Sequence, residues 1–551
     1  MSARADLEAA LQEPAANESG LNYSEGRAYR LFLLISVLIV LLAASLRVYH
    51  ISKRSLWLDE AIAANISRGT LSQTLTLTRD LHSAPIVDPL ILYAVERVAN
   101  GPLAVRTASL LASILAVILM LCFVTIPSID YKTAGLSALM LSVSAAQIRY
   151  AQEVREYSLS VLYGGVLLYV FLSYVSKKDN ERHNSPILLY VSLFFAPLIQ
   201  YGLVLFSFGV LAALLASAFA EGKLKRQIAH IFMASGFLAL GGVLSLFLTL
   251  RYQFGDDAWY LKDYFLEPGS NVLRFVLSNT HHLVTFLLPG LAAALISVLA
   301  ILVYLVSSLR RRTVPPLVML ACASCGIVLA CSILRVYPYG GIRQCLFLAP
   351  VLCLLASVSL VHVARMFAGR GNAIVFAAIA GIIVVSGVFQ IRDLKPYAEI
   401  ENIQRVLLTL HDDIQPGDAV YIYPGAVFAV DFYVRDRDPR FIYGSYHQQA
   451  PGKYVPEMMG GLNPNANRLW LVFSHVYRNE DQVILHGLSK DWQVEPVVSV
   501  TGSSLYLATR TIAPSRASNG AIGTSRTPLL ADHTHDTFWD WNIRNSRYPN
   551  Q

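Results

Sequence analysis

Long apolar runs follow one another along most of the chain, separated by short polar connections. A helix of about 20 apolar residues crosses the hydrocarbon core of a bilayer. Runs of that order predict eleven transmembrane helices, at residues 31–48, 103–124, 133–148, 157–175, 187–203, 205–220, 229–250, 284–307, 315–334, 345–366 and 373–390. We therefore expect a polytopic α-helical membrane domain over residues 31–392.

The two ends of the chain have a different pattern. Residues 1–30 are polar, with charges of both signs, and predict an N-terminal tail on the cytoplasmic side. Residues 396–510 contain a helical pattern at 400–410 and strand-length apolar runs between turn residues, which predict a small α/β domain. The expected strands lie at residues 419–423, 468–473, 495–500 and 504–508. Residues 511–551 are rich in Ser, Thr, Asn and Asp and predict a disordered tail.

Basic residues are concentrated in four short connections between apolar runs, near residues 177–182, 223–226, 310–312 and 365–370. Short loops rich in Lys and Arg stay on the cytoplasmic side. With eleven spans, these four connections share one side. The opposite, extracytoplasmic side then receives a first outer loop at residues 49–102, three later hairpins or loops, and the C-terminal α/β domain. Within the first outer loop, residues 85–99 predict a helix in the membrane interface.

Composition supports a membrane protein, because 55% of the residues are hydrophobic and only 15% are charged, against roughly 25% charged in soluble domains. The net charge of +7 does not indicate nucleic-acid binding, since membrane orientation explains the basic loops. All six cysteines lie in or beside apolar runs. They predict packing residues rather than a disulfide framework.

Two adjacent carboxylates, Asp59 and Glu60, lie shortly after the first apolar run, residues 31–48. Carboxylates at the mouth of a span are costly to bury and are expected to face water, a partner or a substrate. One of them could act as a general base for a hydroxyl nucleophile, while the other positions it or binds substrate. The alternative from spacing alone is an amphipathic loop helix whose acids cap it or face water.

Further polar clusters interrupt the apolar runs on the same side. The segment 147–157 carries charges and amides among tyrosines, and on a helix Arg149, Gln152, Glu153 and Glu156 would share one face. Arg343 lies in a later outer hairpin, where the positive-inside bias disfavours it. We interpret Arg343 as the partner of an anionic group such as a phosphate or carboxylate, with snorkelling to the interface as the alternative. The loop 251–283 combines aromatic and acidic residues that suit either a carbohydrate or an interfacial aromatic belt.

The sequence shows no closed set of metal ligands. His281 and His282 are adjacent, which is not ligand spacing, and Asp436-Arg437-Asp438 lies in a polar turn remote from the membrane clusters. No phosphate-binding loop, zinc-protease motif or serine-hydrolase elbow occurs. No cofactor is therefore assigned, and a divalent metal ion is left open.

Three motifs resemble one family of bacterial transferases. Leu58-Asp59-Glu60 after the first span, His82 with Pro85, and Arg106 at the start of the next span resemble its first-loop pattern. Tyr150-Ala151-Gln152-Glu153-Val154-Arg155-Glu156-Tyr157 resembles its Q-E-x-R-x-Y signature, and Tyr339-Gly340-Gly341-Ile342-Arg343-Gln344 resembles a later arginine motif. The chain is thus similar, over residues 30–510, to glycosyltransferases related to protein O-mannosyltransferase and the lipid A aminoarabinose transferase.

The resemblance implies a GT-C fold and a polyprenyl-phosphate-linked sugar donor used at the outer face of the inner membrane. It implies that Asp59 is the catalytic base and that Arg343 pairs with the departing lipid phosphate. The remaining implied substrate-binding residues are Glu60, His82, Arg149, Gln152, Glu153, Arg155, Tyr157 and Tyr339. The implied acceptor is a hydroxyl of a glycan, a lipid or a protein, and membrane lipids surround the protein.

Two other functions fit a polytopic membrane protein. A transporter or flippase for a lipid-linked glycan predicts charges within spans and a paired internal repeat, whereas the charges here cluster at span ends. A polysaccharide polymerase would move a lipid-diphosphate-linked glycan rather than a single sugar. The sequence leaves the identity of the sugar and of the acceptor open.

Overall fold

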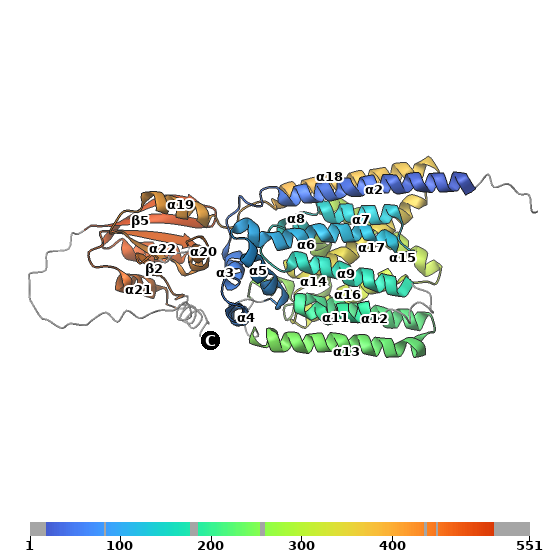
Figure 1. The fold of residues 1–551 in the computed structure, drawn as a ribbon, viewed down its shortest axis with the longest axis horizontal. Coiled ribbons are helices and arrows are strands. Elements are labelled where there is room, and N and C mark those ends of the chain that lie inside the picture. Colours follow the sequence, from blue (N-terminus) through green and yellow to red (C-terminus); the bar gives the residue numbers. More distant parts are fainter. Residues whose placement is uncertain are drawn as a thin grey trace, which may run out of the picture.

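The computed structural model describes residues 18–81, 84–176, 186–253, 259–434, 438–447 and 450–511. Figure 1 shows a bundle of long helices with a smaller α/β domain at one end and a few short helices between them. The described part of the chain is thus a polytopic helical protein with a C-terminal domain, as the apolar pattern predicts. The predicted tail at 512–551 lies outside the described residues, as do residues 1–17.

Nine helices of the described residues are long and apolar enough to cross a membrane. They are α2 (Glu18–Val48), α6 (Pro102–Cys122), α9 (Tyr157–Ser176), α12 (Gly202–Ala220), α13 (Leu224–Leu248), α15 (Gly290–Arg310), α16 (Pro316–Ile333), α17 (Ala349–Arg365) and α18 (Arg370–Leu394). In α2, the span itself covers Tyr29–Val48. Each of the nine coincides with one of the eleven predicted runs.

The other two predicted spans are shorter helices, α7 (Tyr131–Val143) and α11 (Ile187–Ile199), of 13 residues each. A 13-residue helix is about 20 Å long, which is less than the hydrocarbon core. The run predicted at 133–148 is interrupted at Ser144, whose extended backbone separates α7 from α8 (Ala145–Tyr150). The apolar pattern does not predict this interruption of the helix, because Ser144 lies among apolar residues.

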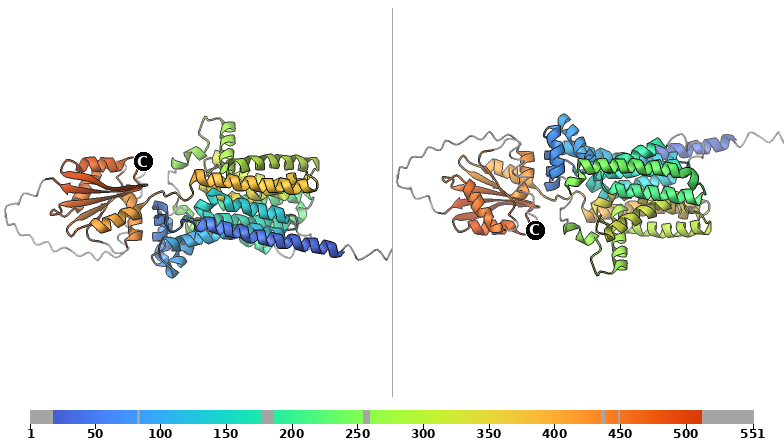
Figure 2. Two further views of the ribbon diagram at one scale, coloured as in Figure 1. Left: turned by 90° about the horizontal axis from the view of Figure 1, so that it is seen from above. Right: turned by 90° about the horizontal axis from the view of Figure 1, so that it is seen from below.

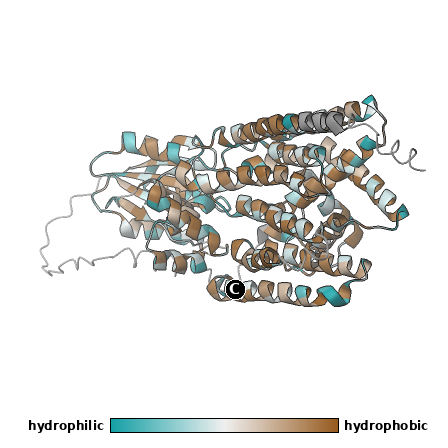
Figure 3. Cartoon of the chain, turned by 45° about the vertical axis from the view of Figure 1, so that its right-hand side comes forward, coloured by the Kyte–Doolittle hydropathy of each residue, from teal (hydrophilic) through white to brown (hydrophobic). Residues whose placement is uncertain are grey.

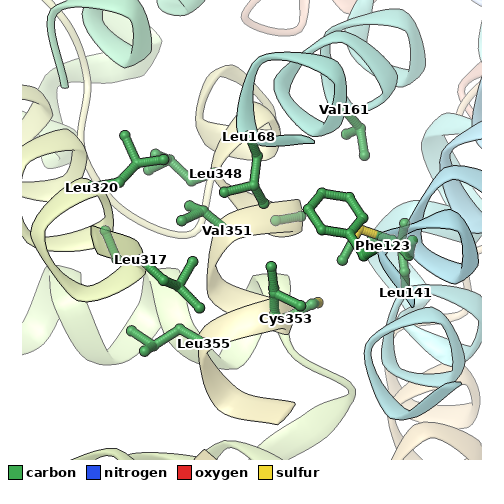
Figure 4. Packing of buried hydrophobic residues seen from close by; sticks show 14 of the residues in the cluster. Phe123, Leu141, Val161, Leu168, Leu317, Leu320, Leu348, Val351, Cys353 and Leu355 are labelled. Atoms are coloured by element: carbon green, nitrogen blue, oxygen red, sulfur yellow. The ribbon is translucent and has the colours of Figure 1, made fainter. Parts of the chain in front are cut away.

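The centre of the bundle is α17, the most buried of the nine long helices. Figure 4 shows Leu348, Val351 and Leu355 of this region packed among side chains from α9 and α16. The helix therefore has apolar neighbours on all sides, which explains why its whole circumference is hydrophobic.

Short helices cover the end of the bundle that faces the C-terminal domain. Three belong to the first outer loop, namely α3 (Leu58–Ile66), α4 (Leu71–Leu81) and α5 (Val87–Val98), and α5 occupies the predicted interfacial segment. A fourth, α14 (Val272–Leu287), lies across the long helices and projects from the bundle in Figure 2. Short 3-10 helices occur at Phe123–Thr125, Leu250–Tyr252, Trp259–Tyr264, Arg343–Leu348, Pro424–Ala426 and Pro451–Lys453.

The C-terminal domain contains a five-stranded sheet in the order β2-β1-β3-β5-β4. The strands are β1 (Ala419–Ile422), β2 (Phe441–Tyr443), β3 (Arg468–Ser474), β4 (Trp492–Val500) and β5 (Ser503–Arg510). Strand β1 pairs in parallel with β2 and β3, whereas β5 pairs antiparallel with β3 and β4. The accompanying helices are α19 (Ile403–Asp413), α20 (Val427–Tyr433), α21 (Tyr454–Gly461) and α22 (Glu480–Leu488).

The four predicted strands are present, and the sequence prediction missed the three-residue strand β2. The predicted helix at 400–410 is present as α19.

Apolar side chains of the first outer loop and of the C-terminal domain form one cluster. Ala61 and Ala64 of α3 are fully buried together with Val427 and Val430 of α20. Polar contacts extend the junction, since Asn65 Nδ2 donates to the carbonyl of Phe428 over 2.6 Å. The domain is therefore held directly against the helix that carries Asp59.

Polar residues gather over the C-terminal domain and at the ends of the bundle, while the middle of the bundle is hydrophobic (Figure 3). Three of the four basic connections lie in the described part of the chain, after α12, α15 and α17. These helices run from the end near the C-terminal domain to the opposite end (Figure 1). The basic connections and Asp59 are thus at opposite ends of the bundle, as the predicted topology requires; which end faces the cytoplasm stays a prediction.

Candidate active site

Asp59 is the second residue of α3, which begins directly after the extended backbone of Trp57. Arg343 begins the 3-10 helix that leads into α17. Its Nη2 donates to Asp59 Oδ2 over 3.1 Å, although 284 residues separate the two in sequence. Both side chains remain partly exposed, at 24% for Asp59 and 19% for Arg343. The fold thus joins two predicted site residues in one accessible ion pair.

Aromatic rings surround the Arg343 guanidinium. Its central carbon lies 5.7 Å from the centre of the Trp57 ring and 5.4 Å from that of Tyr157. Tyr157 is buried and also faces Arg155, at 5.9 Å. Aromatic faces attract cations and limit the rotamers of a long side chain, so Arg343 is held in position. The indole N–H of Trp57 is buried and donates to no acceptor in the described part of the chain.

Neighbouring cations control the charge of Asp59. Burial by itself raises the pKa of this carboxyl, but the charges of Arg155 and Arg343 and the hydrogen bond from Arg343 outweigh burial. The net result is an Asp59 pKa below its ordinary value of 3.8. Asp59 is therefore ionised at neutral pH and can accept a proton.

Glu60 is placed differently from its neighbour. Its side chain is 1% exposed and forms a bidentate ion pair with Arg106, with contacts of 2.9 and 2.7 Å. Glu60 Oε1 also accepts from the backbone N–H of Val154 over 3.0 Å. Arg106 in turn donates to the carbonyls of Ile51, Arg54 and Ser55. Because both carboxylate oxygens are engaged, the geometry does not support the expected contact of Glu60 with substrate and instead assigns it to positioning the loop.

The hairpin between α8 and α9 is also tied down by buried polar contacts. Gln152 is buried, and its Nε2 donates to the carbonyls of Arg47 and Tyr49 over 2.8 Å each. Arg149 Nε donates to Glu153 Oε1 over 3.1 Å. Burial raises the pKa of Glu153 despite the opposing charge of Arg149. Gln152 thus joins the hairpin to the end of α2, and Arg149 is the more exposed partner of its pair, at 28%.

Arg155 is the residue of this hairpin that contributes charge to the Asp59 site. Its guanidinium is 8% exposed, pairs with Glu156 at 3.7 Å and acts electrostatically on Asp59. Arg155 and Arg343 are therefore two cations near Asp59, and each already faces a carboxylate, Glu156 and Asp59 respectively. An anionic ligand that binds here would compete with these carboxylates for the guanidiniums.

Two further predicted site residues, Tyr339 and His82, are not part of the Asp59 cluster in the described part of the chain. Tyr339 is buried and its hydroxyl is within 3.0 Å of Thr280 Oγ1, so it braces the loop before Arg343 against α14. His82 lies outside the described residues.

An apolar groove of about 930 Å³ reaches the loop that precedes Arg343. It is lined by α14, the start of α15 and the second half of α18, and includes Gly341, two residues before Arg343. Phe286 of this lining contacts the ring of Tyr150, which in turn contacts Tyr157. The groove therefore leads from apolar helix surfaces toward the rings that hold Arg343.

Metal binding finds no support in the described residues, which contain no group of three or more His, Cys, Asp or Glu side chains that could hold an ion. A divalent metal ion held in part by substrate groups stays open, as in the sequence analysis.

The sequence analysis assigned no site role to three residues that complete the site, although it named Arg106 as part of the first-loop motif. Arg106 holds Glu60, and Glu401 and His475 of the C-terminal domain approach α3 from outside the membrane. A charged residue at the start of an apolar run was a visible signal for Arg106. No local pattern marks Glu401 or His475, because their position depends on how the domain packs.

No family model and no curated protein matches the sequence. Solved structures, however, match its fold. ArnT from Cupriavidus metallidurans bound to undecaprenyl phosphate has a TM-score of 0.54 at 11% identity, covering 89% of this chain and 99% of that one. This chain has the GT-C fold.

The apo form of the same ArnT also matches this GT-C chain, with a TM-score of 0.54, 11% identity, and coverage of 88% and 98%. The apo oligosaccharyltransferase of Archaeoglobus fulgidus has a TM-score of 0.49 at 10% identity, covering 80% of this chain and 69% of that one. The two ArnT matches confirm the fold expected from the motif resemblance.

Proposed function

We propose that this chain is an integral-membrane glycosyltransferase that moves a sugar from a polyprenyl-phosphate donor to a hydroxyl acceptor. The observation that carries the proposal is the pair of Asp59 and Arg343, joined over 3.1 Å and partly exposed. A carboxylate can accept the proton of an attacking hydroxyl, and a fixed guanidinium can stabilise a leaving phosphate. Glycosyl transfer from a lipid phosphate requires both of these groups.

In the proposed reaction, Asp59 accepts the proton of the acceptor hydroxyl. The hydroxyl oxygen forms the new bond to the anomeric carbon while the bond from that carbon to the phosphate oxygen breaks. The electron pair of the broken bond leaves with polyprenyl phosphate, whose added charge Arg343 and Arg155 stabilise. One base and one direct displacement favour inversion at the anomeric carbon.

The Arg343 contact also connects donor binding to the basicity of Asp59. The hydrogen bond from Arg343 is one of the interactions that lower the Asp59 pKa. A phosphate within reach of Arg343 would compete for that hydrogen bond, and the indole N–H of Trp57 would be a further donor. Asp59 would then gain proton affinity when the donor is bound.

The apolar groove supports a lipid-linked donor. It has room for part of a polyprenyl chain, and Gly341, two residues before Arg343, belongs to its lining. The ArnT of the same fold was crystallised with undecaprenyl phosphate. A prenyl chain in the groove would place its phosphate at the cationic site, because the chain can leave the groove toward Arg343.

The acceptor is a hydroxyl of a glycan, a lipid or a protein, and the chemistry takes place on the extracytoplasmic side of the inner membrane. The basic connections at the opposite end of the bundle support that orientation. Nucleotide sugars are absent on that side, so a lipid-linked donor is required there.

Purified protein in detergent or lipid should release polyprenyl phosphate from a polyprenyl-phosphate sugar when membrane lipids and glycans are supplied as acceptors. Thin-layer chromatography or mass spectrometry of the lipid phase measures the release. Inversion is checked by the anomeric configuration of the product.

Two outcomes would replace the proposal by its alternatives. Movement of an intact lipid-linked glycan across proteoliposomes, without release of polyprenyl phosphate, would identify a flippase. Release of polyprenyl diphosphate from a lipid-diphosphate glycan would identify a polymerase.

A further inference from the structure

Glu401 and His475 of the C-terminal domain meet at its junction with the first outer loop. Glu401 lies in the segment between α18 and α19, and His475 directly follows β3. They are 74 residues apart, yet Glu401 Oε1 lies 2.6 Å from His475 Nδ1. A buried carboxylate on a ring nitrogen is an arrangement that fixes the orientation of an imidazole.

Glu401 connects this histidine to the helix of the proposed base. Its side chain is 3% exposed. Oε2 accepts from the backbone N–H of Leu58 over 3.1 Å and from Ser474 Oγ over 3.3 Å. Leu58 is the residue before Asp59, so one carboxylate holds both the start of α3 and the His475 ring.

The backbone of His475 is held in an unusual conformation. Its φ of 50° lies in the left-handed region that L side chains rarely adopt. A β-carbon on Gly425 would lie 2.6 Å from the His475 carbonyl, so the chain is closely packed there. Strained residues of this kind persist where the surrounding structure over-determines them and are concentrated at functional sites.

The imidazole remains accessible. Its side chain is 46% exposed, although its partner Glu401 is buried. Because a carboxylate only accepts, Nδ1 carries the hydrogen of that contact, and Nε2 makes no hydrogen bond within the described residues. Burial lowers the pKa of His475, but Glu401 and the charge of Asp59 raise it to a value above its ordinary one. The structural link between the ring and Asp59 is Glu401, which contacts both His475 Nδ1 and the backbone N–H of Leu58, the residue before Asp59.

We propose that His475 is an acceptor-binding residue, supplied by the C-terminal domain to the Asp59 site and oriented by Glu401. The inference rests on the proposed glycosyl transfer. Arg343, Arg155 and the groove come from membrane elements and suit the donor, whereas His475 belongs to the C-terminal domain and is linked to the start of α3 through Glu401. Its free Nε2 can hydrogen-bond a polyhydroxyl acceptor such as a glycan, of which one hydroxyl reaches Asp59.

The test uses membrane vesicles that contain the full-length chain and a radiolabelled polyprenyl-phosphate sugar. Two products are measured, namely label transferred to endogenous acceptors and free labelled sugar from hydrolysis of the donor by water. His475→Ala should lower transfer by roughly 10-fold, as expected for one lost hydrogen bond, and leave hydrolysis unchanged. His475→Gln, which keeps a hydrogen-bonding group, should restore part of the transfer.

The control variant is His486→Ala, because His486 is an exposed histidine of the same domain, at the end of α22. It should behave as wild type in both measurements. Thermal unfolding of each purified variant verifies that the domain is intact.

Three results have distinct meanings. Unchanged transfer by folded His475→Ala protein would overturn the acceptor role. An equal loss of transfer and hydrolysis would also overturn it, because His475 would then act on the donor or on Asp59. If wild-type vesicles form neither product, the proposed glycosyl transfer itself fails.

Discussion

Adjacent residues have opposite environments at the start of α3. Asp59 is partly exposed and contacts Arg343, whereas Glu60 is buried against Arg106. On a helix, neighbouring side chains point about 100° apart, so one faces the site and the other faces the bundle. The two carboxylates therefore differ in function although the sequence presents them as a pair.

Replacing Asp59 by Asn removes the proposed base and preserves the shape of the side chain. We expect transfer to fall by roughly 100-fold to 10,000-fold, the usual contribution of a general base. The measurement is the initial rate of polyprenyl phosphate release at saturating donor. Binding of polyprenyl phosphate by this variant should be as tight as in wild type or tighter, because Arg343 loses its competing carboxylate. An active Asp59→Asn enzyme would contradict the base assignment.

Replacing Glu60 by Ala leaves the buried Arg106 guanidinium without its partner. Breaking a buried ion pair in this way costs about 3–5 kcal/mol, so we expect a marked loss of stability in denaturant or heat. A matched control is Asp393→Ala, which breaks the exposed pair with Arg392 and should cost less than about 1 kcal/mol. Equal stability of the two variants would show that Glu60 does not hold the loop.

The hairpin between α8 and α9 and the loop before α17 bring the cations of the site to Asp59. Arg155 comes from the first element and Arg343 from the second, and the ring of Tyr157 lies against both. Buried contacts of Gln152 fix the hairpin to α2. These elements therefore preorganise positive charge before a ligand arrives.

The groove beside α18 gives a prediction about the lipid part of the donor. Val385 lines the groove, and Ile374 lies on the same helix, exposed outside it. A Val385→Trp substitution should obstruct a prenyl chain and raise the KM for a polyprenyl-phosphate sugar by roughly 10-fold with little change in kcat, because uniform binding is lost. Ile374→Trp should leave KM unchanged. If both variants have the wild-type KM, the groove does not hold the lipid.

At the scale of the whole molecule, the membrane domain and the C-terminal domain meet at the start of α3, beside the proposed base. Asp59 and Arg343 belong to the first, Glu401 and His475 to the second, and a shared apolar cluster joins α3 to α20. The C-terminal domain is thus packed directly against the first outer loop of the membrane domain rather than tethered beside it.

This junction should make stability depend on pH. Glu401 and Asp59 raise the pKa of His475 above its ordinary value of 6.5. A group whose pKa is higher in the folded state than in the unfolded state stabilises the fold fully at pH values below its pKa in the unfolded state. That stabilisation is lost as the pH rises through its pKa in the folded state. We therefore expect the unfolding temperature of wild type to fall, relative to that of His475→Ala, as pH rises from about 6 to 9.

The control for this prediction is His486→Ala, which should follow the wild-type curve. The comparison by scanning calorimetry or dye-based thermal unfolding isolates His475 from other titrating groups. If the difference in unfolding temperature between wild type and His475→Ala did not change with pH, protonated His475 would not stabilise the junction between the two domains.

The apolar pattern by itself predicted the membrane domain, and nine of the eleven predicted spans are long helices. It also predicted helix α19 and four strands of the C-terminal domain. These features depend on local composition, since a long apolar run has few stable alternatives to a membrane helix. The pattern could not reveal that Ser144 divides α7 from α8, because that break depends on contacts with neighbouring helices. The motif resemblance implied that Asp59, Arg155 and Arg343 are site residues, but it did not show that they lie close together.

Only the tertiary structure decided how the charged residues pair. It placed Asp59 with Arg343 and Glu60 with Arg106, and it brought Glu401 and His475 against the start of α3. These contacts join residues 46 to 343 positions apart. The pairing of charged side chains depends on the distance between them and on their burial. No local sequence pattern specifies either quantity. The sequence therefore supplied the candidate charged groups, and the packing of the fold assigned their partners.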